Sequence, residues 1–410
     1  MLKKIGEENK NSNKIISNWL LNFSGIAIMN AVLQLIIFPF LNRQIGSEKF
    51  GIVLYLMAFV SIMSPSFGQA AMNARLVGRR NHDYKNGDFN IVLLLFCFIT
   101  IAITLITAHS VLNGVLSNLL MSGVLLLTTW RYYADVEFRM NLSFNKYFFY
   151  YLILSIGYIL GYGFYLLTSS WYLIFITGEL AALCYVWFIG HIFKPFLLKG
   201  KDKFSALKAS VTLALSYLLF HLSLQLDRII LKSLIGNIAV SEYFVVSLIG
   251  KALVLLVSPL NAIILSYLSR SSKHIDRKTF GVYSGLIILG CMVFLAICQL
   301  VVPVFIRILY PDMYENIKNL IFIANLAQIL SVASTTVFVI VLTFTKEIWQ
   351  VILQLIHIVL FVIISIILTK LNGVEGFAIA ALIANTIRLV SIILVGIVKA
   401  SDRKEELELI

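Results

Sequence analysis

Charged residues are scarce in this sequence. Asp, Glu, Lys and Arg together make up 13% of the 410 residues, about half the share that is usual in soluble domains. Only six prolines are present, and no long polar or low-complexity stretch interrupts the chain. The composition therefore excludes a disordered chain and gives no sign of a separate soluble domain.

Cysteine is also rare, and the motifs of common enzymes are missing. The four cysteines fall inside hydrophobic runs without CxxC spacing, so we expect neither a disulfide framework nor a metal site. The sequence has no GxxxxGK[ST] phosphate loop, no HExxH and no GxSxG. We therefore predict no catalytic residues and no cofactor, and do not expect an enzyme.

Hydrophobic residues, in contrast, make up 60% of the chain. A bilayer core requires about 20 apolar residues per helix. Twelve runs meet this requirement, at residues 19–41, 50–72, 89–108, 110–130, 147–168, 171–193, 210–231, 243–268, 280–306, 320–345, 348–369 and 376–398. The pattern predicts an all-α polytopic membrane protein with about twelve transmembrane helices.

Basic residues are distributed unevenly between these runs. With the N-terminus inside, 24 of the 33 Lys and Arg residues fall in cytoplasmic segments, including Lys3, Lys4, Lys10 and Lys14. Positive residues favour the cytoplasmic side, so we expect both termini there. The first run is too long for the hydrophobic part of a signal peptide, and we interpret it as a span. The net charge of +13 then reflects contact with anionic membrane lipids, and nucleic-acid binding is not expected.

The longest predicted cytoplasmic connection divides the runs into six and six. The predicted parts are an N-terminal half at 1–193, a linker at 194–208, a C-terminal half at 209–398 and a cytoplasmic tail at 399–410. A faint repeat supports two equivalent halves, because Ile45-Gly46 recurs as Ile235-Gly236 after the first helix of each half. Parallel repeats with a site between them are a known transporter plan, so we expect two six-helix bundles around a central cavity.

Five charged residues fall inside the predicted spans: Glu179, Asp227, Arg228, Lys251 and Arg388. A charge inside the bilayer is costly unless it faces a cavity or a partner, which makes these residues candidates for function. The alternative is structural, with Asp227 paired to Lys251 or Arg388 and polar groups bonded between helices. Glu179 and Asp227 are candidates either for carrying a coupling ion, H⁺ or Na⁺, or for a purely structural role.

Polar residues recur at helical spacing in several spans. Tyr217, His221, Gln225 and Arg228 are separated by four, four and three residues, so they share one face of the seventh span. Further polar positions in the C-terminal half are Ser247, Ser258, Asn325, Gln328, Ser331, Gln350, Gln354, His357 and Asn385. This half is thus predicted to line a wet cavity whose excess positive charge attracts an anionic substrate.

The fifth span combines tyrosines with closely spaced glycines. Tyr158, Tyr162 and Tyr165 share a face on which aromatic rings could stack on sugars. Gly157 and Gly161 have the GxxxG spacing that permits close helix contact. Both interpretations, sugar contact and helix packing, are open at this point.

Several short motifs resemble one family. They are Arg43-Gln44-Ile45-Gly46 leading to Phe50-Gly51, Leu226-Asp227-Arg228 in the seventh span, Ile235-Gly236 with 240–243, and 372–376 before the last helix. Together with twelve spans split six and six, they resemble the polysaccharide flippases of the multidrug, oligosaccharidyl-lipid and polysaccharide exporter superfamily, of the O-antigen and capsule repeat-unit type.

The resemblance implies a bacterial inner-membrane protein that moves an undecaprenyl-diphosphate-linked oligosaccharide from the cytoplasmic to the outer leaflet by alternating access. The cationic cavity of that family corresponds here to Arg228, Lys251 and Arg388, with Gln225, His221 and Tyr217 as further substrate contacts. Polysaccharide polymerase and assembly proteins are candidate partners, and we expect a monomer. Two alternatives are a cation-coupled multidrug antiporter of the same superfamily and a membrane glycan polymerase or acyltransferase.

Overall fold

A computed structural model describes residues 23–112, 114–198, 200–270, 275–346 and 348–408. In these ranges the chain is nearly all helical, without a β-strand, which confirms the predicted all-α class. The four N-terminal lysines Lys3, Lys4, Lys10 and Lys14 and the start of the first predicted span lie outside the described residues.

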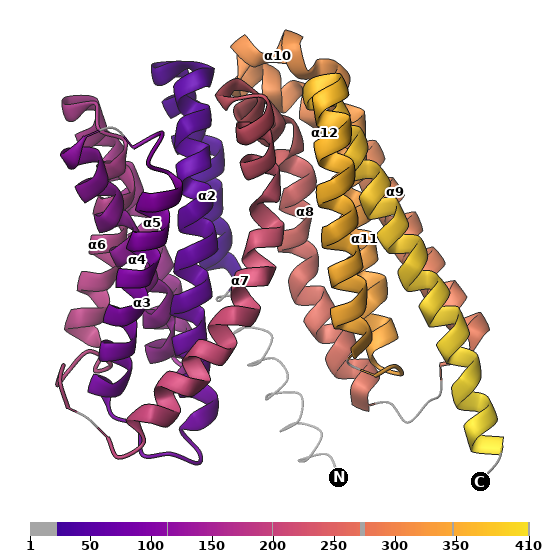
Figure 1. The fold of residues 1–410 in the computed structure, drawn as a ribbon, viewed down its shortest axis with the longest axis horizontal. Coiled ribbons are helices and arrows are strands. Elements are labelled where there is room, and N and C mark those ends of the chain that lie inside the picture. Colours follow the sequence, from indigo (N-terminus) through magenta and orange to yellow (C-terminus); the bar gives the residue numbers. More distant parts are fainter. Residues whose placement is uncertain (1–22, 113, 199, 271–274, 347, 409–410) are drawn as a thin grey trace, which may run out of the picture. The chain divides into compact units, whose positions relative to one another are not determined.

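The helices follow the predicted runs along the chain (Figure 1). They are η1 (Val32–Ile37), α2 (Phe38–Gly78), α3 (Asn86–Thr107), α4 (Val115–Met140), α5 (Phe144–Thr168), α6 (Tyr172–Ile189), α7 (Lys203–Leu234), α8 (Asn237–Arg270), α9 (Arg277–Leu309), α10 (Pro311–Ile317), η2 (Lys318–Leu320), α11 (Ile321–Leu342) and α12 (Ile348–Glu408).

Nine helical segments of the described residues are long and apolar enough to cross a membrane. Two of them hold two predicted spans each, because α2 is broken at Gly46 and α12 at Asn372 and Gly373. The helix α4, which is not among the nine, holds the fourth predicted span. Each of the twelve predicted runs therefore lies largely on a helix in the described residues, and the differences are a few residues at the ends of the runs.

The repeated Ile-Gly pairs mark turns between spans. Gly46 has φ +78° and Gly236, between α7 and α8, has φ +131°. Side chains with a Cβ rarely adopt such backbone angles, whereas glycine does so freely. The repeat seen in the sequence thus has a conformational cause at both positions.

The chain divides into two compact units. The first contains residues 1–41 and 56–225, and the second contains 42–55 and 226–410, so that α2 and α7 contribute to both. These units are groupings by contact, and the domain boundaries at 193 and 209 stay a prediction.

Close helix contact holds part of the first unit together. A Cβ on Gly157 of α5 would lie 2.7 Å from the Cα of Gly178 on α6, and one on Gly161 would lie 2.6 Å from the carbonyl oxygen of Ile174. Glycine at these positions lets the two backbones approach, and the helix-packing interpretation of Gly157 and Gly161 is therefore correct.

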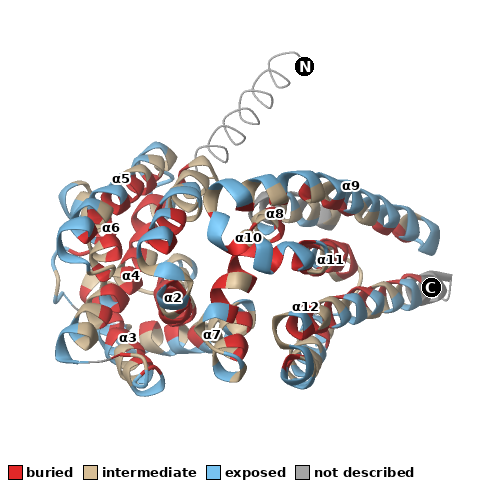
Figure 2. Cartoon of the chain, turned by 90° about the horizontal axis from the view of Figure 1, so that it is seen from above, coloured by how far each residue is buried: buried red, intermediate tan, exposed pale blue. Residues whose placement is uncertain are grey.

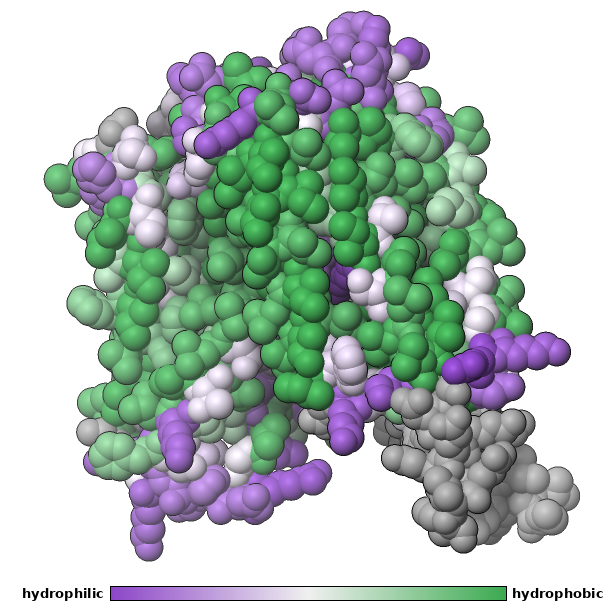
Figure 3. Space-filling view, turned by 45° about the vertical axis from the view of Figure 1, so that its right-hand side comes forward, coloured by the Kyte–Doolittle hydropathy of each residue, from purple (hydrophilic) through white to green (hydrophobic). Residues whose placement is uncertain are grey.

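In the second unit, α11 and the first part of α8 are largely buried, whereas few residues of α9 and α12 are buried in their apolar stretches (Figure 2). The exposed side chains are largely Leu, Ile and Val. Figure 3 shows hydrophobic residues over the middle of the visible face and hydrophilic residues gathered at its two ends. This is the pattern of a surface that is solvated by lipid.

Candidate functional site

An ion pair joins α7 and α8 within the second unit. Lys251 Nζ on α8 contacts Asp227 Oδ2 on α7. The Asp227 side chain is 10% exposed and that of Lys251 is 29% exposed. The predicted pairing partner of Asp227 is therefore Lys251, and the carboxylate of Asp227 neutralises one of the three intramembrane cations.

Arg228 lies beside this pair but is not neutralised by it. Its guanidinium lies 5.2 Å from the ring centre of Phe244, and Nη1 donates to the Leu54 carbonyl oxygen at 3.4 Å. Its Nε is buried without a hydrogen-bond partner among the described residues, where Arg228 also forms no ion pair. An aromatic face and a carbonyl stabilise a cation only in part, so Arg228 keeps its capacity to bind an anion.

The third cation, Arg388, lies on the part of α12 that follows the break at Asn372 and Gly373, and its side chain contacts the part that precedes the break. Its Nη2 donates to Gln354 Oε1 at 3.2 Å. His357 Nε2 and Asn385 Oδ1 are 3.1 Å apart, and Asn385 Nδ2 donates to the Ala327 carbonyl oxygen at 2.9 Å. Within the described chain Arg388 has hydrogen bonds but no carboxylate within ion-pair distance.

A row of aromatic and amide side chains connects these groups within the second unit. Lys251 Nζ lies 5.6 Å from the ring centre of Tyr243, whose hydroxyl accepts a hydrogen bond from Gln328 Nε2 at 3.3 Å. The Tyr243 and Phe377 rings are 4.8 Å apart, and Phe361 contacts both Phe377 and His357. We call Asp227, Arg228, Lys251 and Arg388 the cationic cluster; among the described residues Arg388 is linked to the other three only through this row of side chains and by no direct contact.

The cationic cluster has three positive groups and one negative group. Charges in a membrane interior interact strongly because the surroundings are weakly polar. The two arginines that lack a carboxylate partner therefore favour an anion, and disfavour a cationic ligand by repulsion. Chemically, this arrangement suits a phosphate-bearing group, since arginine donates to two phosphate oxygens at once.

Three other predicted site residues lie on the part of α7 that belongs to the first unit. Asn73 Nδ2 donates to the Tyr217 hydroxyl at 2.7 Å. His221 Nε2 is buried and has no partner among the described residues, and Gln225 is half-buried. The four residues of the predicted stripe lie on one continuous helix, α7. Tyr217, His221 and Gln225 belong to the first compact unit, whereas Arg228 belongs to the second.

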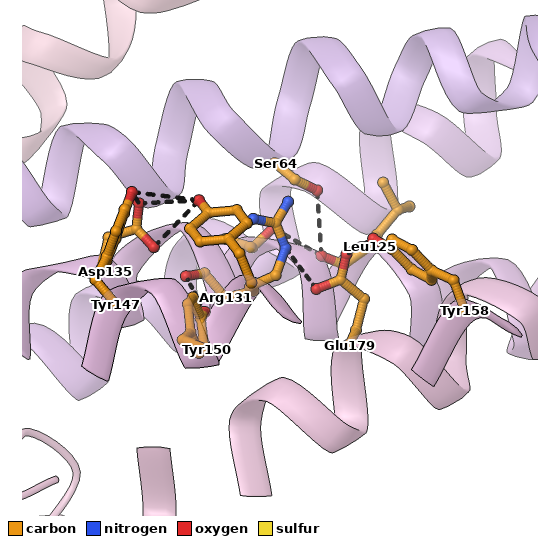
Figure 4. A network of polar contacts seen from close by, with 10 residues as sticks. Ser64, Leu125, Arg131, Asp135, Tyr147, Tyr150, Tyr158 and Glu179 are labelled. Carbon is orange, nitrogen blue, oxygen red and sulfur yellow. Dashed lines mark hydrogen bonds and ion pairs between the residues drawn. The ribbon is translucent and has the colours of Figure 1, made fainter. Parts of the chain in front are cut away.

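Glu179 is the remaining predicted residue, and it is paired. Arg131 Nε on α4 lies 2.6 Å from Glu179 Oε2, and the two side chains are 4% and 2% exposed. The Tyr158 hydroxyl donates to Glu179 Oε1 at 3.0 Å. Figure 4 shows the guanidinium of Arg131 pointing at the carboxylate, with Tyr158 approaching from the other side.

Arg131 and Asp135 were not predicted as site residues. The fourth predicted span ends at residue 130, which places Arg131 in a cytoplasmic segment and leaves Glu179 as the only acid in the first six spans. The structure corrects this, because α4 continues to Met140 and both residues are buried. Asp135 accepts hydrogen bonds from Tyr147 at 2.9 Å and Tyr151 at 3.3 Å. Two features of the sequence could have indicated these residues: Arg131 and Asp135 have i, i+4 spacing on one helix, and Glu179 had no predicted partner of opposite charge.

Comparisons with known proteins give a consistent result for the fold. No family model and no curated protein matches this chain. An inward-facing multidrug resistance MATE family transporter of the MOP superfamily superposes with a TM-score of 0.63 at 14% identity, covering 94% of this chain and 95% of the other. The lipid II flippase MurJ in an inward closed conformation gives a TM-score of 0.65 at 15% identity, covering 92% and 87%.

The chain has the fold of the MOP-superfamily transporters. A MOP-superfamily transporter from Pyrococcus furiosus, with a TM-score of 0.59 at 12% identity and coverage of 94% and 95%, is described as having a binding pocket of reverse polarity that suggests a different function. The MOP-superfamily fold thus includes both multidrug transporters and a lipid flippase. These similarities show a shared fold alone, and the function of this chain has to be argued from the site.

Proposed function

We propose that this protein is a flippase that moves an undecaprenyl-diphosphate-linked oligosaccharide from the cytoplasmic to the outer leaflet. The observation that supports it best is the cationic cluster, in which Arg228 and Arg388 have no carboxylate partner among the described residues. A diphosphate carries the opposite charge. Among the cargoes of proteins with this fold, a lipid diphosphate fits that cluster better than a lipophilic cation does.

The barrier to such a lipid is its head group. A bare ion costs tens of kcal/mol to move into hydrocarbon, on the order of the Born energy, and each unbonded sugar hydroxyl adds to it. Arg228, Lys251 and Arg388 would hold the diphosphate, while Gln225, His221 and Tyr217 would donate to or accept from the glycan. The lipid tail would stay in the bilayer while the protein opens alternately to each side.

Asp227 is the proposed point of ion coupling. Its carboxylate competes with the diphosphate for Lys251, so protonation of Asp227, or Na⁺ binding to it, would release Lys251 for the substrate. We further propose an inner-membrane location with both termini cytoplasmic, a monomer as the working unit, and polymerase or assembly proteins as partners.

The second candidate function is a cation-coupled multidrug antiporter. The structural similarity to MATE transporters favours it. Against it stands the balance of charge, since Glu179 is already paired with Arg131 and Asp227 with Lys251. Neither carboxylate is free to receive a lipophilic cation in this conformation.

Reconstitution into proteoliposomes separates the two functions. We expect transbilayer movement of a fluorescent undecaprenyl-diphosphate oligosaccharide, with at least about a tenfold loss of rate in Arg228→Gln and Arg388→Gln, as for a lost charged hydrogen bond. Arg307→Gln is the matched control, because Arg307 is exposed near the end of α9.

The same vesicles are tested for uptake of a cationic dye driven by H⁺ or Na⁺ gradients. Dye uptake without lipid movement, lost in Asp227→Asn or Glu179→Gln, would establish the antiporter instead. Lipid movement at the wild-type rate in both arginine variants would leave the cationic cluster without its proposed role.

A further inference from the structure

A cavity of about 150 Å³ is lined entirely by residues of the first unit and shares no residue with the cationic cluster. It is bounded by η1 and the residues before it, by α2, and by α4, α5 and α6. Its lining includes the buried pair Arg131 and Glu179, the polar side chains Asn30 and Ser61, and the ring of Tyr158. By volume it has room for about five water molecules, on the order of one sugar ring.

The ion pair at this cavity has unused hydrogen-bonding capacity. Arg131 Nη1 is buried and has no hydrogen-bond partner among the described residues. Glu179 accepts from Tyr158 at Oε1 and pairs with Arg131 at Oε2, and a carboxylate offers about four lone-pair positions. The pair can therefore donate to one group and accept from another, side by side.

This combination favours an uncharged ligand with several hydroxyls. An anion would be attracted by Arg131 but repelled by Glu179, and a cation would meet the reverse. A hydroxyl, in contrast, both donates and accepts. Two neighbouring hydroxyls of a sugar ring can bond to Arg131 Nη1 and to Glu179 without introducing a net charge into the buried site.

Aromatic rings complete the site. Tyr132, Tyr158 and Phe175 line the cavity, and the guanidinium of Arg131 lies 4.1 Å from the ring centre of Tyr132, which fixes its orientation. The Tyr158 ring also contacts Phe175 edge to face. Aromatic faces stack on the C–H faces of sugar rings through dispersion and apolar burial. The cavity thus has both the polar and the apolar contacts that a monosaccharide requires.

We propose that this cavity binds one uncharged sugar residue of the transported glycan, and that Arg131 and Glu179 select it by its hydroxyl arrangement. The inference rests on the proposed flippase function, which it extends from the diphosphate to the sugar. For Tyr158, both interpretations from the sequence then apply. Its ring packs against Phe175 and also lines the cavity that would hold the sugar.

Direct binding tests the proposal without transport. Purified protein in lipid nanodiscs, free of sugar-based detergent, is examined by saturation-transfer NMR with methyl glycosides of glucose, galactose, mannose, rhamnose, N-acetylglucosamine and N-acetylgalactosamine. We expect transfer to the ring protons of at least one glycoside. We expect Arg131→Leu to weaken that binding about tenfold or more, as for loss of a charged hydrogen bond.

Arg131→Leu leaves the buried Glu179 unpaired and can therefore destabilise the protein. A second variant tests the cavity without breaking the ion pair. Ser61→Phe fills the cavity with a ring and leaves the ion pair in place. Leu180→Phe is its control, since it adds the same ring at a 44% exposed position of α6. We expect loss of transfer in Ser61→Phe and wild-type transfer in Leu180→Phe, in samples with matching size-exclusion profiles.

Equal transfer in wild type and Ser61→Phe would overturn the proposal. So would the absence of transfer from all six glycosides. Methyl glucuronide and methyl glucosaminide are added as charged probes, and transfer from these alone would also overturn the proposal, because a charge requirement would indicate an ion site. Binding of a neutral glycoside in a protein that flips no lipid would leave this cavity a sugar site and remove the flippase function. Lipid movement in a protein whose glycoside binding does not depend on Ser61 would support the flippase function and remove the sugar site.

Discussion

The side chain of Asn325 on α11 bonds to the backbone of α8 at Gly250. Its Oδ1 accepts from the Gly250 amide at 2.9 Å, and its Nδ2 donates to the Val246 carbonyl oxygen at 2.9 Å. These two backbone groups are the i+4 and i positions of one helical turn. Lys251 follows directly, so Asn325 fixes the turn of α8 from which the lysine of the cationic cluster projects.

Asn325→Ala should destabilise the protein by about 1–3 kcal/mol, because Asn325 is fully buried and both bonds to α8 are lost. A lowered melting temperature of the purified protein in detergent would show this. Gln350→Ala is the control, since Gln350 is exposed on α12 and should leave the melting temperature unchanged. Equal melting of the two variants would contradict the structural role of Asn325.

Gly250→Ala should also be destabilising. A Cβ there would lie 2.9 Å from both Asn325 Oδ1 and Gln328 Cβ, which is too close without a shift of α8 or α11. The matched control is Gly281→Ala on α9, where a Cβ meets no atom within 4 Å. Because alanine favours a helix over glycine by about 1 kcal/mol, the control should melt at the same temperature or higher.

The buried pair Arg131 and Glu179 should show strong coupling. Removing one partner leaves an uncompensated charge, which costs about 3–5 kcal/mol in buried pairs. We expect Arg131→Leu to lower the melting temperature more than the double variant Arg131→Leu, Glu179→Leu does. Additive effects would mean that the pair is not coupled. Lys318→Met breaks an exposed pair with Glu315 and should have no measurable effect.

Asp227 and Lys251 should affect anion binding in opposite directions. Asp227→Asn removes the acid that occupies Lys251, whereas Lys251→Gln removes a cation. Titration calorimetry with inorganic pyrophosphate should give tighter binding in the first variant and at least about tenfold weaker binding in the second, equal to about 1.4 kcal/mol. Lys370→Gln, at an exposed position, should bind like wild type. Unchanged affinity in both cluster variants would argue against a phosphate site.

The sequence was sufficient for the fold because apolar runs of about 20 residues report directly on membrane helices. It placed the turns between spans at Gly46 and Gly236, where positive φ angles explain the repeated Ile-Gly pairs. It also indicated close helix contact at Gly157 and Gly161, although the partner, α6, was known only from the structure. These features depend on local sequence, which is why they could be predicted without the structure.

The site was predicted only in part. Asp227 and Lys251 were recognised as candidate partners because they are charged and lie in consecutive spans. Arg131 was missed because the apolar run at 110–130 already had the length of a span before it. Its neutralisation by Glu179 depends on a residue 48 positions further along the chain, on another helix. The bonds of Asn325 to Gly250 depend likewise on tertiary packing, which no periodicity in one helix reveals.

The two ion pairs also differ in when they can form during synthesis. Asp227 and Lys251 lie on α7 and α8, which follow one another across the turn at Gly236, so the two helices can enter the bilayer as a hairpin in which Asp227 already neutralises Lys251. Arg131 on α4 must wait for α6 to be made before Glu179 reaches it. A charged residue at the centre of a lone helix costs about 2.5–3.5 kcal/mol for insertion. Before α6 is made, the buried Arg131 lacks the carboxylate that neutralises it, so a nascent chain that stops after α5 should hold α4 in the membrane less firmly than one that includes α6.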